Sequence, residues 1–113
     1  MNFNIKRVKI FVMVPSENLE EIRKAICDAG AGVIGNYTFC SVATNVLGTF
    51  IPNDNANPYM GEKNKLEYVE EVKLEVICDI EKVKEVLQVL REIHPYEEAA
   101  IDIVPLLNEN DFY

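Results

Sequence analysis

The sequence is short of the residues on which enzyme active sites most often depend. Its 113 residues include one histidine, three cysteines and no tryptophan. The odd number and wide spacing of Cys27, Cys40 and Cys78 argue against a disulfide framework and against a CxxC redox or zinc motif. Each cysteine is expected to be a small buried hydrophobe. With no Walker loop and no serine or cysteine in readable reach of a histidine, the sequence predicts no catalytic residues.

Basic residues are also few: 11 lysines and arginines stand against 19 aspartates and glutamates, for a formal net charge of -8. Such a chain lacks the basic stripe that nucleic acids need, and anionic membranes would repel it. No apolar run is long enough to span a bilayer, and Ile10–Val14 is too short for the core of a signal peptide. We therefore expect a cytoplasmic protein without a nucleic-acid or membrane partner, whose acidity serves solubility.

Hydrophobic periodicity predicts one α+β domain. A chain of 113 residues with 49% hydrophobic residues suits one core rather than two. The apolar spacing predicts strands over residues 6–14, 36–43, 46–51, 66–78 and 98–104, and helices over residues 17–29 and 80–94. Residues 52–64, rich in Asn, Pro and Gly, are expected to form an exposed loop. The domain is predicted to cover residues 1–106, followed by a loose acidic tail at residues 107–113.

This order of elements is typical of the ferredoxin-like βαββαβ fold. Right-handed crossovers then give a four-stranded antiparallel sheet with two helices on one face and an extra hairpin or loop in the middle. In that topology the corners at residues 15–18 and 94–98 and the loop 52–64 meet at one end of the sheet. The glycines of residues 30–35 would lie at the opposite end.

One face of such a sheet has no helix to cover it. Phe11, Met13, Val69 and Ile77 are predicted to point toward that face. An uncovered apolar face on a small domain marks an association surface. We therefore expect a homo-oligomer, most simply a trimer that packs its sheets around an axis, with a small molecule or a protein as a further partner.

The segment Gly30–Gly35 has the spacing G-x-G-x-x-G of a dinucleotide-binding turn, but in the wrong context. That fingerprint follows a strand and opens a helix, whereas these glycines close a helix and lead into a strand. A helix cap followed by a tight strand entry is the structural interpretation. An anion held by free backbone N–H groups near Asn36 and Tyr37 is the functional alternative, and it makes Tyr37 a candidate ligand-binding residue.

The corner His94–Glu98 holds the strongest candidate site residues. His94, Tyr96, Glu97 and Glu98 are candidates for ligand binding, and His94, Glu97 and Glu98 could hold a divalent metal through an imidazole nitrogen and hard carboxylates. One histidine with two adjacent glutamates is not a recognised metal spacing. The structural alternative is a helix stop, in which His94 caps the helix and Pro95 fixes the exit of the chain.

Five blocks of sequence, in order, resemble one known family. They cover nearly the whole of residues 6–106 and comprise Gly32–Cys40, Gly48–Pro52, Asn57–Gly61, Glu67–Val72 and His94–Ala99 with Asp102. This pattern resembles the PII/CutA-like domain inserted in YqfO-type dinuclear-metal proteins, and its stand-alone relatives. One departure is Val46, where the family often has a further glycine, and it leaves the bend of the middle hairpin in doubt.

The resemblance implies a trimeric, ferredoxin-like PII/CutA domain and says little about chemistry. The dinuclear metal site of YqfO-type proteins lies in flanking domains that this sequence does not match, so no hydrolase activity is carried over to its residues. The loop 52–64 corresponds in position to the flexible loop that PII-like proteins use for partners and nucleotides, by fold analogy alone.

Three functional hypotheses follow from the sequence. The first is a non-catalytic, trimeric PII/CutA-like binding or regulatory module with an unknown ligand. The second is a divalent-metal-binding protein that uses His94 and the nearby carboxylates, in which case a divalent metal is the cofactor. The third is a small enzyme whose site forms between subunits, for which the sequence offers no second nucleophile–base pair.

Overall fold

The computed structural model describes residues 3–113, so Met1 and Asn2, the start of the predicted domain, lie outside the described residues. These described residues form four strands and two helices, with a short 3-10 turn before each helix and another near the C-terminus. In chain order the strands and helices are β1 (Arg7–Val14), α1 (Leu19–Asp28), β2 (Ser41–Phe50), β3 (Glu67–Asp79), α2 (Val83–Ile93) and β4 (Ile101–Leu106).

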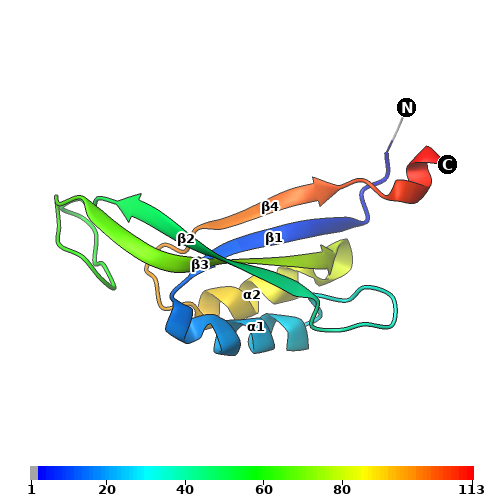
Figure 1. The fold of residues 1–113 in the computed structure, drawn as a ribbon, viewed down its shortest axis with the longest axis horizontal. Helices are drawn as coiled ribbons and strands as arrows, with labels where there is room; N and C mark the ends of the chain where they lie inside the picture. The colour runs from blue at the N-terminus through cyan, green and yellow to red at the C-terminus, as the bar shows by residue number, and fades with distance from the viewer. Residues whose placement is uncertain (1–2) are drawn as a thin grey trace.

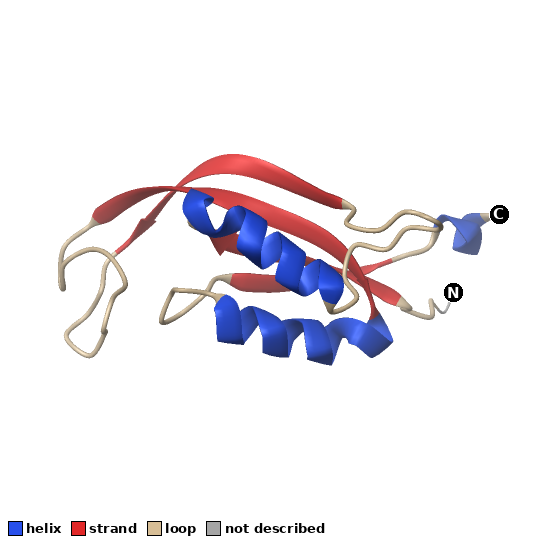
Figure 2. Cartoon of the chain, turned by 90° about the horizontal axis from the view of Figure 1, so that it is seen from below, coloured by secondary structure: helices blue, strands red, loops and turns tan. Residues whose placement is uncertain are grey.

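The four strands make one antiparallel sheet in the order β2-β3-β1-β4. Both helices pack on the same face of this sheet, which gives the two layers seen in Figures 1 and 2. Each half of the chain is a strand–helix–strand unit. A right-twisted strand and its crossover helix pack back onto the sheet with one hand, and both helices therefore lie on the same face. The predicted ferredoxin-like fold is therefore confirmed.

The core lies between the helices and the inner face of the two central strands. Along β1, and along β3 from Val72 onward, every second side chain is buried, as expected for strands with one covered face. Fully buried side chains from both strands and both helices meet there, among them Ile10, Leu74, Ile22, Ile26 and Leu90. Each such side chain contributes about 1.5–3 kcal/mol of hydrophobic stabilisation on burial.

The middle of the chain differs from the prediction. Residues 36–43 and 46–51 were expected to be two strands with a turn at Thr44 and Asn45, but residues 36–40 lie outside the four strands, and one strand, β2, runs through the predicted turn. Every residue of β2 pairs with β3, from Ser41 opposite Val76 to Phe50 opposite Glu67. Ten consecutive pairs with a long partner strand outweigh the weak turn preference of Thr44 and Asn45. The excursion in the middle is the loop 51–66, which includes the predicted loop 52–64.

The glycine segment forms a helix cap and a tight turn. After α1, Gly30 N–H bonds to the Cys27 carbonyl at 3.1 Å and Ala31 N–H to the Ile26 carbonyl at 3.1 Å. This pair of bonds is a Schellman cap, and Gly30 has the positive φ (120°) that the cap favours. Beyond it, Ile34 and Tyr37 exchange two backbone hydrogen bonds around a two-residue turn.

The helix-free face carries the four predicted apolar residues, but charged side chains lie among them. Phe11, Met13, Val69 and Ile77 are all half-buried on this face. In the same layer, the Lys73 ammonium lies 4.6 Å from the centre of the Phe11 ring, a cation–π contact, and Lys9 lies 4.0 Å from Glu75. The face is thus amphipathic rather than uniformly apolar.

The two ends of the molecule are distinct. The loop 51–66 lies at one end of the long axis, and the segment 30–40 lies near the other end together with the start of β1 and the C-terminus (Figure 1). At the terminal end, the ring centres of Phe3 and Phe112 are 5.7 Å apart, and Asn108 caps a 3-10 turn over Glu109–Phe112. None of the helices in residues 3–113 is long and apolar enough to cross a membrane.

Candidate functional site

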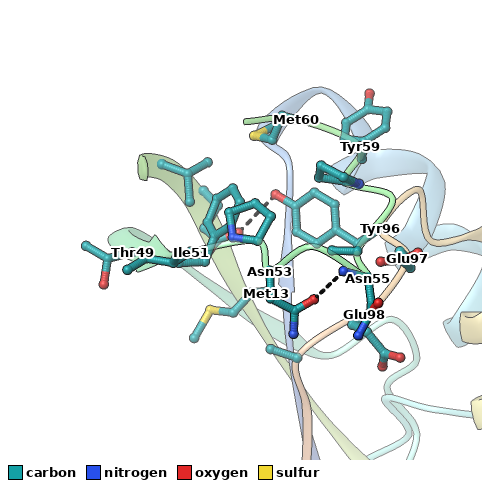
Figure 3. A pocket seen from close by; sticks show the side chains of 17 residues that line it. Met13, Thr49, Ile51, Asn53, Asn55, Tyr59, Met60, Tyr96, Glu97 and Glu98 are labelled. Atoms are coloured by element: carbon teal, nitrogen blue, oxygen red, sulfur yellow. Dashed lines mark hydrogen bonds between the residues drawn. The ribbon is translucent and has the colours of Figure 1, made fainter. Parts of the chain in front are cut away.

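A cavity of about 630 Å³ lies under the loop 51–66, between this loop, the ends of β1 and β3, and the corner 94–100. Pockets of about 300–1,000 Å³ with mainly apolar walls are typical of small-molecule sites. Aromatic, thioether and aliphatic side chains make most of the wall, with carboxylates and amides between them. The lining includes Met13, Phe50, Ile51, Pro52, Pro58, Tyr59, Met60, Val69 and Tyr96, together with Glu71, Glu97, Glu98, Asn53 and Asn55. We call this cavity the loop pocket (Figure 3).

The loop over the pocket is attached to the corner by Glu97. The backbone N–H of Asn57 lies 3.0 Å from each carboxylate oxygen of Glu97, across 40 residues of sequence. Hydrogen bonds to an ionised acceptor are about twice as strong as neutral ones. Within the loop, the Asn53 side chain accepts from Asn55 N–H at 3.0 Å, which is the turn chemistry expected of asparagine. The Asn57–Glu97 contact therefore holds the loop against the corner beside the pocket.

Tyr96 forms part of the pocket wall and is held by Glu71. Its hydroxyl donates to a Glu71 carboxylate oxygen at 3.1 Å, and its ring centre lies 5.9 Å from that of Tyr59. A Cβ at Gly48 would lie 2.8 Å from the other Glu71 oxygen, so this glycine leaves the carboxylate the space it occupies. Burial and the Glu71 carboxylate raise the pKa of Tyr96, and the phenol therefore keeps its proton as a donor.

His94 joins the helix end to the first strand. One ring nitrogen, Nε2, lies 2.7 Å from the Met13 carbonyl, and the other, Nδ1, accepts the Tyr96 N–H at 3.1 Å. Since Nδ1 accepts, the proton of the neutral ring is on Nε2 and is donated to Met13. Burial lowers the pKa of His94, with Arg91 acting in the same direction and the Met13 carbonyl opposing it. The neutral imidazole thus makes a hydrogen bond with each of its nitrogens.

The stability of the fold is expected to decrease as the pH falls below about 6.5, the usual histidine pKa. Because the pKa of His94 is lowered in the folded state, the unfolded chain takes up the proton first. The contribution of His94 is fully present above the unfolded-state pKa and is lost as the pH falls toward the folded-state pKa. Urea unfolding at about pH 7.5 and pH 5.5 measures this loss. A His94→Gln variant with the same pH slope as the wild type would assign the loss to other groups.

The structure brings together four of the five residues predicted to bind a ligand. His94, Tyr96, Glu97 and Glu98 lie at the corner beside the loop pocket, and the last three line it. Tyr37 is 75% exposed on the turn at the other end of the sheet. The predicted separation of the glycine segment from the corner is therefore observed, and Tyr37 does not share a site with the others.

Other pocket residues were not predicted as site residues. Glu71 lies in the regular alternation of β3, where nothing in the sequence separates it from the other glutamates of the strand, although it is half-buried and bonded to Tyr96. The loop residues Asn57 and Tyr59 were assigned to an exposed excursion. The predicted meeting of the loop with the corner was the signal that could have identified them.

No group of three or more His, Cys, Asp or Glu side chains within residues 3–113 is placed to hold a metal ion. A metal on His94 would have to replace its hydrogen bond with Met13 or with Tyr96. Metal binding by His94, Glu97 and Glu98 therefore stays a prediction, and it requires a rearranged corner or ligands from a second chain.

The sheet order, the paired helices and the long β2–β3 loop define a PII/CutA-like fold, and solved structures show the same fold. The chain superposes on CutA of Archaeoglobus fulgidus, a periplasmic divalent cation tolerance protein, with a TM-score of 0.66 at 22% identity over 88% of this chain and 83% of that one. For GlnK of Bacillus subtilis the TM-score is 0.60 at 15% identity, over 89% and 85% of the two chains. No family model matches the sequence.

More similar sequences belong to longer proteins. The chain is 41% identical over 103 residues to the GTP cyclohydrolase 1 type 2 homolog of Halalkalibacterium halodurans, covering 91% of this chain and 28% of the relative. It superposes on a NIF3-related protein of Bacillus cereus with a TM-score of 0.81 at 39% identity, over 95% of this chain and 27% of that one. The predicted resemblance to YqfO-type proteins is confirmed, and the chain spans about a quarter of the length of these relatives.

Proposed function

We propose that the chain is a non-catalytic, cytoplasmic, homotrimeric module of the PII/CutA-like type, which binds a ligand in the loop pocket. The observation that carries this proposal is the Asn57–Glu97 contact, which closes a long loop over an apolar and acidic cavity. Cavities under loops held by a rigid sheet are where binding sites concentrate. Ligand and partner are to be identified by binding experiments on the purified chain.

The chemistry of the described residues supports binding over catalysis. His94 uses both ring nitrogens in backbone hydrogen bonds, which leaves neither as a general base in this conformation. Burial raises the pKa of the Cys27 thiol, and burial followed by Asp79 raises that of Cys78 to about 11. Thiols with raised pKa values are poor nucleophiles near neutral pH.

The helix-free face supports trimer formation, and the mass of the chain in solution tests it. Light scattering on the purified chain should give about 39 kDa, three chains of 12.9 kDa each. Val42→Lys places a charge on an exposed apolar position of that face and should shift the mass toward 12.9 kDa. Gln88→Lys, on the exposed face of α2, is the matched control and should leave the mass unchanged. A monomer at micromolar concentration for the wild type would exclude the trimer.

Divalent-metal binding is the second candidate function. The observation in its favour is the pair of adjacent carboxylates, Glu97 and Glu98, which closely follow His94 in the sequence, since such donors suit divalent cations. Zinc, copper or nickel is titrated into the wild type, the His94→Ala variant and the Glu98→Gln variant. A metal site predicts that binding decreases at least about tenfold in one of the variants. Equal and weak binding by all three proteins would rule it out.

A further inference from the structure

The loop pocket has walls suited to an organic molecule with an apolar body. Its volume of about 630 Å³ is far larger than a hydrated metal ion requires and falls in the range of small-molecule sites. Ile51, Pro58 and Val69 contribute aliphatic surface, and Met13 and Met60 contribute polarizable thioethers. Tyr59 is 53% exposed and its ring centre lies 5.9 Å from that of Tyr96, so the wall also offers aromatic surface to a ligand.

Every charged side chain in the pocket wall is negative. Glu71, Glu97 and Glu98 line it, and within the described part of the chain the lining includes no lysine, arginine or histidine. Glu97 is occupied by Asn57 N–H, and Glu71 accepts from Tyr96. Glu98 makes no hydrogen bond or ion pair with the rest of residues 3–113. One carboxylate is therefore left to meet a ligand.

We propose that the loop pocket binds a small organic cation: an amine whose charge faces Glu98 and whose aromatic or aliphatic body lies against Tyr59 and the apolar wall. This inference rests on the proposed function, because it assumes that the loop pocket is the ligand site. An ammonium group is attracted electrostatically by the carboxylates and by the face of a tyrosine ring. A phosphate or nucleotide would meet three carboxylates and no compensating cation. The net charge of -8 adds a field that attracts cations to the surface.

Three compounds with one ring system and different charges test the class of ligand. Tryptamine is the cation, tryptophol the neutral analogue and indole-3-acetate the anion, each titrated into the full chain by calorimetry at neutral pH and low salt. We expect tryptamine to bind about fivefold or more tightly than tryptophol, and indole-3-acetate to bind most weakly. Equal binding of all three, tightest binding of indole-3-acetate, or no binding of tryptamine would overturn the proposal.

A pair of variants tests the position of the charge. Glu98→Gln should weaken tryptamine about fivefold and leave tryptophol unchanged, because the amide keeps the shape and removes the charge. Glu92→Gln, on α2 and outside the pocket lining, is the matched control and should leave both affinities unchanged. Circular dichroism checks that both variants fold. Equal tryptamine affinity for wild type and Glu98→Gln would overturn the assignment of Glu98.

The proposed ligand class and the proposed trimeric module are tested by different measurements. A trimer that does not bind tryptamine in these titrations would overturn the proposal of a cationic ligand, while the proposal of a trimeric module would hold. A monomer that binds tryptamine through Glu98 would overturn the proposal of a trimer and would support the proposal of a cationic ligand. Tight binding of ATP, used as an anionic probe, would overturn the cation while supporting the loop pocket as a ligand site.

Discussion

Replacing His94 by alanine is expected to cost about 3 kcal/mol of folding free energy and to open the loop pocket. The variant leaves the Met13 carbonyl and the Tyr96 N–H without their partners at a position where His94 is only 8% exposed. Each buried polar group left unpaired costs about 1–3 kcal/mol. Because Tyr96 forms a wall of the pocket, its displacement should also weaken tryptamine binding.

Urea unfolding measures the His94→Ala effect, with Glu92→Ala as a control on the exposed face of α2. The control should remain within about 0.5 kcal/mol of the wild type. The structural role predicts that the stability loss appears without any added metal and is not altered by a chelator. A loss that appears only when zinc is present would instead support a metal at His94.

Replacing Leu74 by alanine is expected to cost about 2–5 kcal/mol, through lost burial and the cavity left behind. Leu74 is 0% exposed in the middle of β3 and lies in the core under the helices. A leucine outside the core provides the control: Leu107, which follows β4, is 48% exposed and its alanine variant should change stability little. Similar losses in both variants, measured by thermal or urea unfolding, would contradict the assignment of the core to the helix-covered face.

Much of the fold was predictable because its main elements have one covered face. The alternation Val8, Ile10, Val12 and Val14 predicts β1 with its buried side, and all four side chains are buried. The chain between α1 and β3 was less predictable. Whether Thr44 and Asn45 turn or pair depends on how far β3 extends beside them, which is a property of the assembled sheet rather than of local sequence.

The candidate site was predictable in position and only partly in composition. Topology alone places the corner 94–98 beside the loop 52–64, and the Asn57–Glu97 hydrogen bonds show that they meet. The role of Glu71 could not be read from the sequence, because a glutamate on the uncovered face of a strand looks solvated until Tyr96 and Gly48 are seen around it. Contacts made by loop backbone N–H groups leave no residue-type signal at all.

The location of the ligand site is the central claim, and amide chemical shifts recorded during a tryptamine titration test it most directly. The isotope-labelled chain should show its largest shift changes at residues 53–60 and 96–98, which surround the loop pocket. Residues 33–39, at the opposite end of the sheet, should remain unchanged. Shift changes concentrated at residues 33–39, with none at the loop and the corner, would contradict the account.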